Sequence, residues 1–335
     1  MIFDTISKDF KAKGDIRIMS FVILSDSACD LTKELRERFN IEYVMGHMTL
    51  PDGTERRTTL EWDFTTPEQF YKDVKAKKNF NPETKQSLYT TAPASIDEFK
   101  EEYKKYLDQG NDLLVITIST GLSATYNFAL KAKEELQAEY PDRKIIVIDS
   151  LRYSTGLGLL VVRAAMKRQE GFDIDCVAKW VEENKSRCHQ MGFLDDLSFV
   201  AMKGRISKPK AFMGQMIGIK PMAEFSYEGL PSVLAKTKGD QAFFDACIKY
   251  IEKTILDPKD QIIFIAQTAR EKQALELKKR IEEKFAPKEV IVNTVHPQNG
   301  INIGPGLCAA YYFGTEISKD LSIEKEYLTQ ILNSK

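Results

Sequence analysis

The stretch at 113–129, LLVITISTGLSATYNFA, constrains the fold most, because a β-branched apolar run leads directly into a polar turn. The apolar part suits a buried strand, and the segment after the turn has the apolar spacing of an amphipathic helix. In α/β sheets, ligands bind beyond the carboxyl ends of strands, where the chain turns into the next helix. The hydroxyl side chains of this turn belong to Ser119, Thr120, Ser123, Thr125 and Tyr126. Because hydroxyls donate hydrogen bonds to an anion without adding charge, we interpret the turn as an anion-binding site.

Short β-branched runs that are typical of strands recur at 21–24, 145–148 and 262–266. Most of them are followed by a segment of helical length and pattern. Apolar residues spaced by three and four predict amphipathic helices over 67–78, 93–110 and 124–140. This alternation places the chain in the α/β class, with a mainly parallel sheet in its N-terminal part.

The pattern of predicted helices and strands changes near residue 166, where we place a domain boundary. A mostly apolar helix is predicted over 154–171. The later part contains a predicted hairpin over 219–237, which turns at Glu228-Gly229, followed by helices and strands in turn. We therefore expect an N-terminal α/β domain over residues 17–165 and a C-terminal α+β domain over residues 166–335.

The charged and metal-binding residue types narrow the classes of partner. Lys and Arg number 48 against 49 Asp and Glu, a net charge of −1, so no nucleic-acid partner is expected. The five cysteines are widely spaced without a CxxC pair, which argues against a disulfide framework or a zinc ribbon. The three histidines form no metal-spaced pair and no P-loop is found, so we expect neither a metal nor a cofactor.

The apolar segments also bear on location. The first twenty residues mix charged and apolar side chains and lack a continuous apolar stretch of signal-peptide length. The segment 157–162, LGLLVV, is among the longest apolar runs and falls far below the roughly 20 residues that span a bilayer. We expect a cytoplasmic protein without a membrane span, whose contact with membranes is at most transient.

Residues 26–30, DSACD, follow the first predicted strand and leave two interpretations open. The Asp and Ser side chains can contact a ligand. Alternatively, Ser27 or Asp30 caps a helix that starts near Leu31, with Glu34 completing a capping box. The sequence alone does not separate the two.

Two further segments can complete the predicted anion site. Residues 90–95, TTAPAS, place adjacent hydroxyls before a helix whose free amide groups suit a carboxylate or phosphate, although a simple capping turn has the same pattern. Because this segment and the turn at 119–125 both join a strand to a helix in one domain, we expect them to form two walls of one site. Lys203 and Arg205 flank Gly204 and can close over an anion, although a solvated surface loop is the usual explanation of such a run.

Two other segments partly match known sequence motifs. The segment 300–306, GINIGPG, departs from the dinucleotide-binding GxGxxG pattern and predicts a constrained turn. GLSAT at 121–125 approaches the GxSxG of an α/β-hydrolase, and Ser123, Asp257 and His296 follow the chain order of its triad. That match is poor, because further polar residues separate the strand from the GLSAT turn.

Taken together and in order, nine segments resemble the DegV family of fatty-acid-binding proteins. They are DSACDL, DFTTPEQFY, TTAPA, ITISTGLSATYNFA, VIDS, STGLGLLV, MKGRIS, GIKPM and GINIGPG. The resemblance covers about residues 20 to 315, so residues 1–16 form an N-terminal extension. It implies an N-terminal α/β domain beside a C-terminal α+β domain, with a fatty acid buried between the two.

The resemblance also implies that hydroxyl side chains hold the carboxylate of the acid. The serine of the family's TSQPS corresponds to Thr91, and the threonine of its DIT-P-E-E-F-Y stretch to Thr66 or Thr65, since the register is ambiguous by one residue. The family's LSGTY corresponds to 122–126, with an alanine in place of the glycine, and its GGRI to 203–206, where the first glycine is lost. The carboxylate-binding residues that we expect are Thr91, Thr66, Thr65, Ser123, Thr125, Ser119, Arg205 and Asn302.

One departure concerns the family's IGxHxGPG sequence, whose histidine is Asn302 in this chain. An Asn donates a hydrogen bond but carries neither a proton nor a charge, so we expect no pH-dependent or phosphoryl-related role of that histidine at Asn302. For the tail, burying roughly fifteen methylenes contributes on the order of 12 kcal/mol before ordering costs. The residues expected to line an apolar tunnel, each of which also suits an ordinary core, are Phe193, Phe199, Phe212, Met213, Met216 and Ile217.

From the residues and the resemblance, we expect a two-domain carrier that binds a long-chain fatty acid in an interdomain tunnel. By resemblance, a fatty acid kinase is the expected partner, to which the carrier presents the acid for phosphorylation. Such a chain binds a substrate and is not itself an enzyme. The alternatives are a serine hydrolase that uses Ser123 and a binding protein for a polar phosphorylated metabolite.

Overall fold

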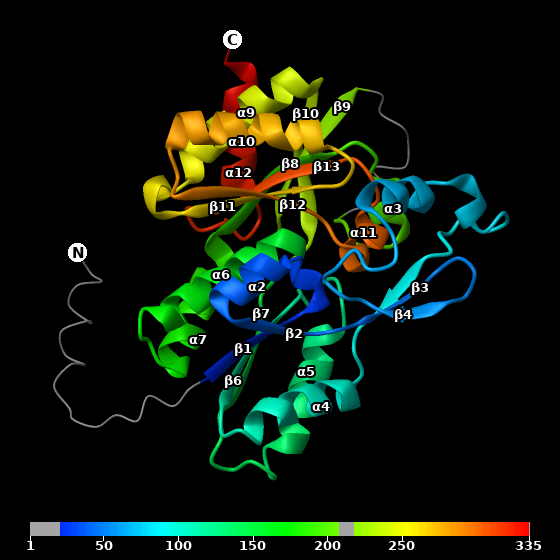
Figure 1. Ribbon diagram of the computed structural model, residues 1–335. Helices are drawn as coiled ribbons and strands as arrows, with labels where there is room; N and C mark the ends of the chain where they lie inside the picture. Colours follow the sequence, from blue (N-terminus) through cyan, green and yellow to red (C-terminus); the bar gives the residue numbers. More distant parts are fainter. Residues whose placement is uncertain (1–20, 208–217, 335) are drawn as a thin grey trace.

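The computed structural model describes residues 21–207 and 218–334, which form two large β-sheets with a long helix between them (Figure 1). The first sheet is entirely parallel, in the order β2-β1-β6-β7. Its strands are β1 (Phe21–Asp26), β2 (Ile41–Val44), β6 (Asp112–Thr117) and β7 (Ile145–Asp149). The parallel N-terminal sheet expected from the sequence is confirmed.

Helices cover both faces of this sheet. On one face, α4 (Ile96–Leu107) and α5 (Thr125–Leu136) pack over β6 through buried apolar side chains. On the other face lie α2 (Lys33–Phe39), α6 (Ser154–Gln169) and α7 (Ile174–Asn184). Helix α4 begins later than the expected Pro93, because Ser95 and Glu98 form a capping box that sets its start.

The second sheet is mixed, in the order β10-β9-β8-β13-β11-β12, and only its β11–β12 pair is parallel within the described residues. Strands β9 (Ile219–Phe225) and β10 (Pro231–Lys238) form the hairpin that the sequence predicted. The other strands are β8 (Cys188–Leu194), β11 (Ile262–Gln267), β12 (Glu289–Thr294) and β13 (Leu307–Phe313). Parallel and antiparallel pairs in one sheet agree with the α+β class expected of the C-terminal part.

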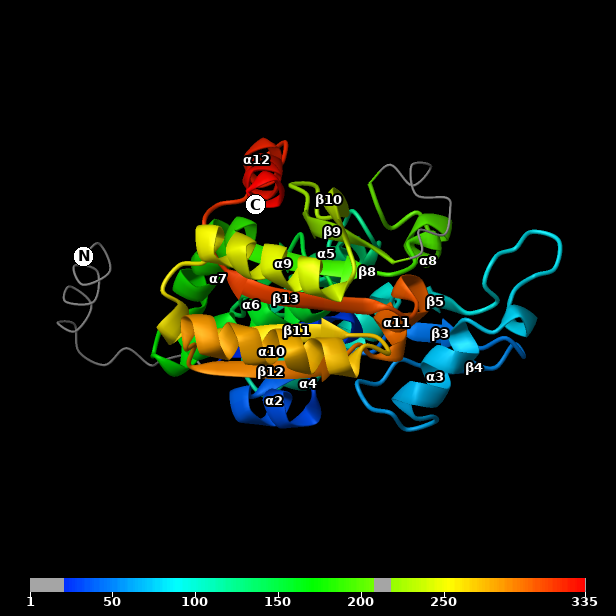
Figure 2. The ribbon, with the colours of Figure 1, turned by 90° about the horizontal axis from the view of Figure 1, so that it is seen from above.

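The outer face of the second sheet carries three helices, two of which Figure 2 shows in front of the strands. They are α9 (Asp240–Thr254), α10 (Glu271–Phe285) and α12 (Ser322–Asn333), and their apolar faces form one core with the sheet. Amphipathic helices bury one face in this way and leave the charged face in solvent.

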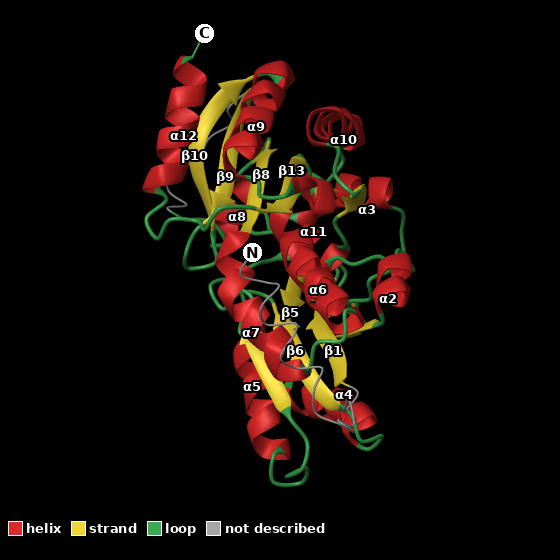
Figure 3. Ribbon diagram, turned by 90° about the vertical axis from the view of Figure 1, so that its left-hand side faces the viewer, coloured by secondary structure: helices red, strands yellow, loops and turns green. Residues whose placement is uncertain are grey.

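Helix α6 lies between the two sheets and contacts both (Figure 3). Its residues from Ser154 to Val162 are all buried, which explains why its sequence is apolar all round. A side chain at Gly156 or Gly158 would collide with Phe225 of β9 or with the backbone of Cys29, so these glycines permit the close packing. The expected domain boundary near 166 falls inside this helix and stays a prediction.

A smaller unit flanks the junction of the sheets. It consists of a short antiparallel sheet, in the order β4-β3-β5, with helices packed against it through a separate apolar cluster. The elements are β3 (His47–Thr49), β4 (Glu55–Arg57), β5 (Thr90–Ala92), α3 (Pro67–Val74), α8 (Ser198–Met202) and α11 (Pro297–Ile303). Figure 2 shows these elements gathered at one end of the molecule. Over the described ranges, every helix is too short or too polar to cross a membrane.

Candidate functional site

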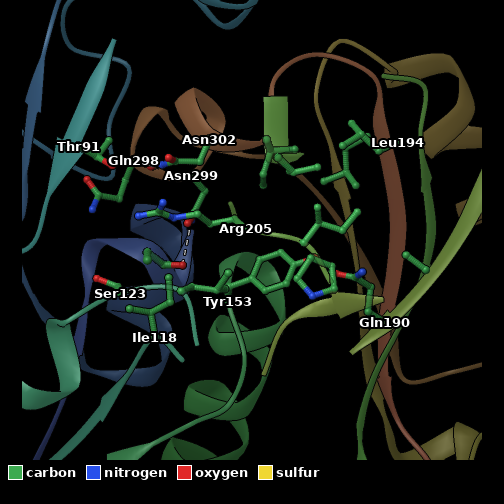
Figure 4. Close-up of a pocket in the computed structure, with 18 of the residues that line it drawn as sticks. Thr91, Ile118, Ser123, Tyr153, Gln190, Leu194, Arg205, Gln298, Asn299 and Asn302 are labelled. Carbon is green, nitrogen blue, oxygen red and sulfur yellow. Dashed lines mark hydrogen bonds between the residues drawn. The ribbon is translucent and has the colours of Figure 1, made fainter. Parts of the chain in front are cut away.

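A cavity of about 310 Å³ lies at the junction of the sheets. Its walls come from β5, the start of α5, β8, β9, α11 and the loop after α8, so segments from both halves of the chain enclose it. Figure 4 shows polar side chains of this cavity at one end and apolar side chains towards β8. The volume falls within the range of about 300–1,000 Å³ that is usual for small-molecule sites.

Thr91 and Asn302 meet at the polar end, although 211 positions separate them in the sequence. The Asn302 amide nitrogen donates hydrogen bonds to the Thr91 hydroxyl oxygen at 3.1 Å and to the Gln298 carbonyl oxygen at 3.0 Å. Because Thr91 accepts from Asn302, its own hydroxyl proton remains available to a ligand. The pair therefore offers a donor that is held in place.

Ser123 and Thr125 form a second hydroxyl pair in the cavity wall, with their oxygens 2.7 Å apart. Thr125 is the first residue of the twelve-residue helix α5, and its backbone amide donates to the Ser123 hydroxyl oxygen at 3.3 Å. Unpaired amide groups in the first turn of a helix attract negative charge. A carboxylate near these hydroxyls would thus meet donors from both the side chains and the helix.

Arg205 supplies a positive charge to the cavity wall. Its guanidinium donates to the Lys203 carbonyl oxygen, and no carboxylate pairs with it among the described residues. Lys203 is absent from the described lining of the cavity, and its ammonium group donates to the Tyr89 carbonyl oxygen at 2.8 Å. Burial and the neighbouring Arg205 lower the pKa of Lys203. Arg205 is thus the cation placed to meet an anionic ligand.

Helix α11 adds two amides that the sequence interpretation missed, Gln298 and Asn299. Asn299 donates to the Ala28 carbonyl at 3.0 Å and to the Asp30 carboxylate at 2.7 Å. The side-chain oxygen of Gln298 is buried and lacks a hydrogen-bond partner within the described residues. Pro297 at the first helical position is the sequence signal for this helix. A helix predicted from this proline would have placed residues 298, 299 and 302 close together.

Asp30 joins the site to the rest of the fold. It is fully buried and accepts hydrogen bonds from the Ser154 hydroxyl, the His296 backbone and the Asn299 amide. Its carboxylate thereby connects α6 to the start of α11. The expectation that Ser27 or Asp30 caps a helix starting near Leu31 is wrong, because Thr32 caps α2 at Lys33.

Comparison with known proteins identifies the family. The model described as "Uncharacterised protein, DegV family" matches residues 20–315. The chain belongs to the DegV family. A DegV domain-containing protein of Clostridium perfringens is 34% identical over 295 residues, which cover 88% of this chain and 97% of that protein.

Solved DegV structures share the fold. A DegV family protein from Thermus thermophilus, whose structure is named for fatty acid binding, has a TM-score of 0.76 at 24% identity, over 88% of this chain and 100% of that one. The Fatty Acid Kinase (Fak) B3 protein of Streptococcus pneumoniae, loaded with linoleic acid, has a TM-score of 0.71 at 20% identity, over 88% and 99%. The expected DegV resemblance and two-domain α/β fold are therefore confirmed.

Three of the predicted carboxylate-binding residues of this DegV chain lie outside the described lining of the cavity. Thr66 caps α3 by accepting from the Gln69 backbone at 3.3 Å, and Thr65 precedes it in the same turn. Ser119 is fully buried and accepts from the Gly121 backbone at 3.1 Å. The other predicted residues line it, namely Thr91, Ser123, Thr125, Arg205 and Asn302.

The apolar part of the DegV cavity lies towards the second sheet. Phe193 lines it, whereas Phe199 packs against the Phe80 ring and Gly304 and is absent from the described lining. The other predicted tunnel residues lie outside the described residues, namely Phe212, Met213, Met216 and Ile217. The apolar lining includes Ile118, Leu122, Leu194, Leu197, Val200, Ile206, Pro221, Ala223, Ile303 and Leu307.

The geometry gives the hydrolase alternative no support. The His296 ring stacks on Trp62 with centroids 5.5 Å apart, and its Nδ1 lies 3.4 Å from the Asp30 carboxylate. The Ser123 hydroxyl pairs with Thr125 and, across the described residues, has no imidazole partner. Asp257 lies away from the cavity. The backbone amide of the preceding Leu256 donates to the Phe313 carbonyl, at the end of β13 opposite to Leu307, which lines the cavity. Nucleophile, base and acid are thus not in hydrogen-bond contact.

Proposed function

We propose that this DegV chain binds a long-chain fatty acid in the cavity between the two sheets. The carboxylate would lie among Thr91, Ser123, Thr125, Arg205 and Asn302, and the acyl chain would extend along the apolar wall. The observation that supports this most is that one cavity combines hydroxyl groups and a long apolar lining with Arg205, which has no carboxylate partner among the described residues. An amphiphile with one anionic end fits such a cavity, whereas a polar phosphorylated metabolite would leave the apolar wall unmatched.

Magnitudes support the same division between head and tail. Each charge-assisted hydrogen bond to the carboxylate contributes about 1.5–3 kcal/mol, and burying each methylene contributes about 0.8 kcal/mol. The tail would therefore supply most of the affinity, and the polar end would orient the acid. This carrier would present the carboxylate to a fatty acid kinase, a role favoured by the likeness to the pneumococcal Fatty Acid Kinase B3 protein.

The direct test is to denature the purified protein, extract it with organic solvent and identify the extract by mass spectrometry. We expect a stoichiometric fatty acid. A folded sample that yields an empty extract and does not bind added octadecanoic acid would refute the proposal.

A pair of variants tests the polar end. Thr91→Val removes the hydroxyl while keeping the shape of the side chain, and we expect the dissociation constant for octadecanoic acid to rise about tenfold. Thr90→Val is the matched control, because the neighbouring Thr90 is exposed and its side chain points to the opposite face of β5. Equal effects of the two substitutions would argue against carboxylate binding at Thr91.

A further inference from the structure

The apolar part of the cavity contains one polar side chain, Gln190, that its surroundings do not satisfy. Gln190 lies on β8, is 3% exposed and lines the cavity. Its backbone amide donates to the Glu224 carboxylate at 2.7 Å, which fixes the residue on the strand. Figure 4 shows Gln190 on the same side of the cavity as Leu194, with Tyr153 between Gln190 and the polar end. The residue is thus a second polar point, apart from the carboxylate site.

Only half of the Gln190 carboxamide is paired. The Tyr153 hydroxyl donates to its oxygen at 2.6 Å, whereas its amide nitrogen has no partner among residues 21–207 and 218–334. If the amide were turned over, Tyr153 would pair with the nitrogen, and the oxygen would be unpaired instead. In either orientation, a polar atom at an apolar wall is left without a hydrogen bond.

The unpaired amide atom faces the cavity, and a purely hydrocarbon ligand that covers it would take away its contact with water and give no hydrogen bond in return. An acyl chain of methylenes alone would cover the amide and satisfy nothing. A hydroxyl group on the chain would satisfy it in either orientation, because a hydroxyl both donates and accepts. A keto oxygen only accepts and would serve one orientation.

We propose that the cavity selects a hydroxylated long-chain fatty acid, whose hydroxyl group lies part-way along the chain and bonds to the Gln190 carboxamide. This inference rests on the proposed function and names the substrate class of the same site. Tyr153 acts as a positioning residue, since it holds the Gln190 side chain against the cavity wall.

The test compares octadecanoic acid with a series of hydroxyoctadecanoic acids in which the hydroxyl is moved along the chain. Affinities are measured on the delipidated full-length protein by displacement of a fluorescent fatty acid. At one hydroxyl position, we expect the wild type to bind the hydroxy acid about three- to tenfold more tightly than octadecanoic acid. Gln190→Met, which keeps the length of the side chain without its polar atoms, should abolish that preference and bind octadecanoic acid at least as well.

The matched control is Arg205→Gln at the polar end. It should weaken binding of both acids by the same factor and leave their ratio unchanged. If the wild type binds octadecanoic acid but prefers no hydroxy acid at any position, this inference is wrong and the proposed function stands. If octadecanoic acid itself does not bind, the proposed function fails. Should Gln190→Met not fold, the hydroxyl scan of the wild type still decides.

Discussion

At the scale of single residues, the environment of each polar group decides its role better than its type does. Asp26 and Asp30 both belong to the DSACD segment, which begins at the last residue of β1. Asp30 connects α6 to α11, whereas Asp26 accepts from the backbone amides of Ala28 and Ile118, each at 2.8 Å. Neither residue caps α2, although the capping pattern was visible in the sequence. Tertiary contacts therefore determined what these carboxylates bind.

Asp26 makes the stability of the fold depend on pH. Burial, opposed by its two backbone hydrogen bonds, raises the pKa of Asp26 to about 6. Between about pH 4 and pH 6, the native state therefore keeps a proton on Asp26 that the unfolded chain, with its ordinary Asp pKa near 3.8, has lost. The free energy of unfolding should thus fall by about 3 kcal/mol between pH 4 and pH 6 on account of this residue.

Urea unfolding at pH 4, 5, 6 and 7 checks this prediction. The variant Asp26→Asn should lack that part of the pH dependence, even if the loss of one backbone hydrogen bond lowers its stability throughout. A pH profile of Asp26→Asn that runs parallel to the wild type would contradict the assignment.

Asn302 also shows a role that only the fold reveals. Its amide orients the Thr91 hydroxyl, so Asn302→Leu should leave Thr91 without its donor and expose an apolar group to the carboxylate. We expect the dissociation constant for octadecanoic acid to rise about tenfold. The melting temperature should change little, since Asn302 is only half-buried. Calorimetric titration and a melting curve separate the two effects. A variant that binds as tightly as the wild type would place the carboxylate elsewhere.

At the scale of elements, periodic patterns predicted the helices well and the small sheet not at all. Apolar spacing predicted α3, α4, α5 and α6, because each buries one face or is buried all round. Strands β3, β4 and β5 are three residues each, too short to show an alternation. Likewise, Gln190 and Gln298 were missed, because strand pairing and helix docking, and not any local motif, bring them to the cavity.

Helix α4 is tied to the small sheet through Glu98. This carboxylate completes the capping box with Ser95 and accepts from His47 of β3 at 2.9 Å and from Arg57 of β4. Desolvation raises the pKa of Glu98, but the hydrogen bonds from His47 and Ser95 and the charge of Arg57 outweigh it and lower the pKa to about 2. A depressed carboxyl pKa stabilises the fold above the unfolded value and loses that effect as pH falls towards 2.

Glu98→Gln should therefore cost about 1 kcal/mol at pH 7, the order expected for a partly exposed ion pair. The difference from the wild type should shrink as the pH falls from 4.5 to 2. Glu101→Gln, an exposed position on the same helix, is the control and should change little. Chemical denaturation at pH 7 and pH 3 tests both variants, and a cost for Glu98→Gln that is unchanged at pH 3 would contradict the ion-pair explanation.

At the scale of the whole molecule, the cavity lies where two sheets, α6 and the small unit meet, so its walls are held by contacts far apart in sequence. The strand-to-helix turn at 119–125 was predictable because it is local. The opposite wall was not predictable from local patterns, since β8 and α11 reach the cavity only when the second sheet packs against α6, and its residues Phe193 and Asn302 were expected only through the family resemblance. A ligand in this position would contact both halves of the fold at once.

Ligand removal should therefore destabilise both halves together. A ligand that binds only the native state adds about 2.7 kcal/mol at a concentration one hundred times its dissociation constant, so delipidation should lower the melting temperature and octadecanoic acid should restore it. Hydrogen exchange should slow on adding the acid in β5 and the start of α5 as well as in β8 and α11. Octadecanol, which lacks the carboxylate, is the control and should protect β8 more than β5. Protection confined to one sheet would mean that the acid binds that sheet alone, because a ligand that bridges the junction must slow the opening of both walls.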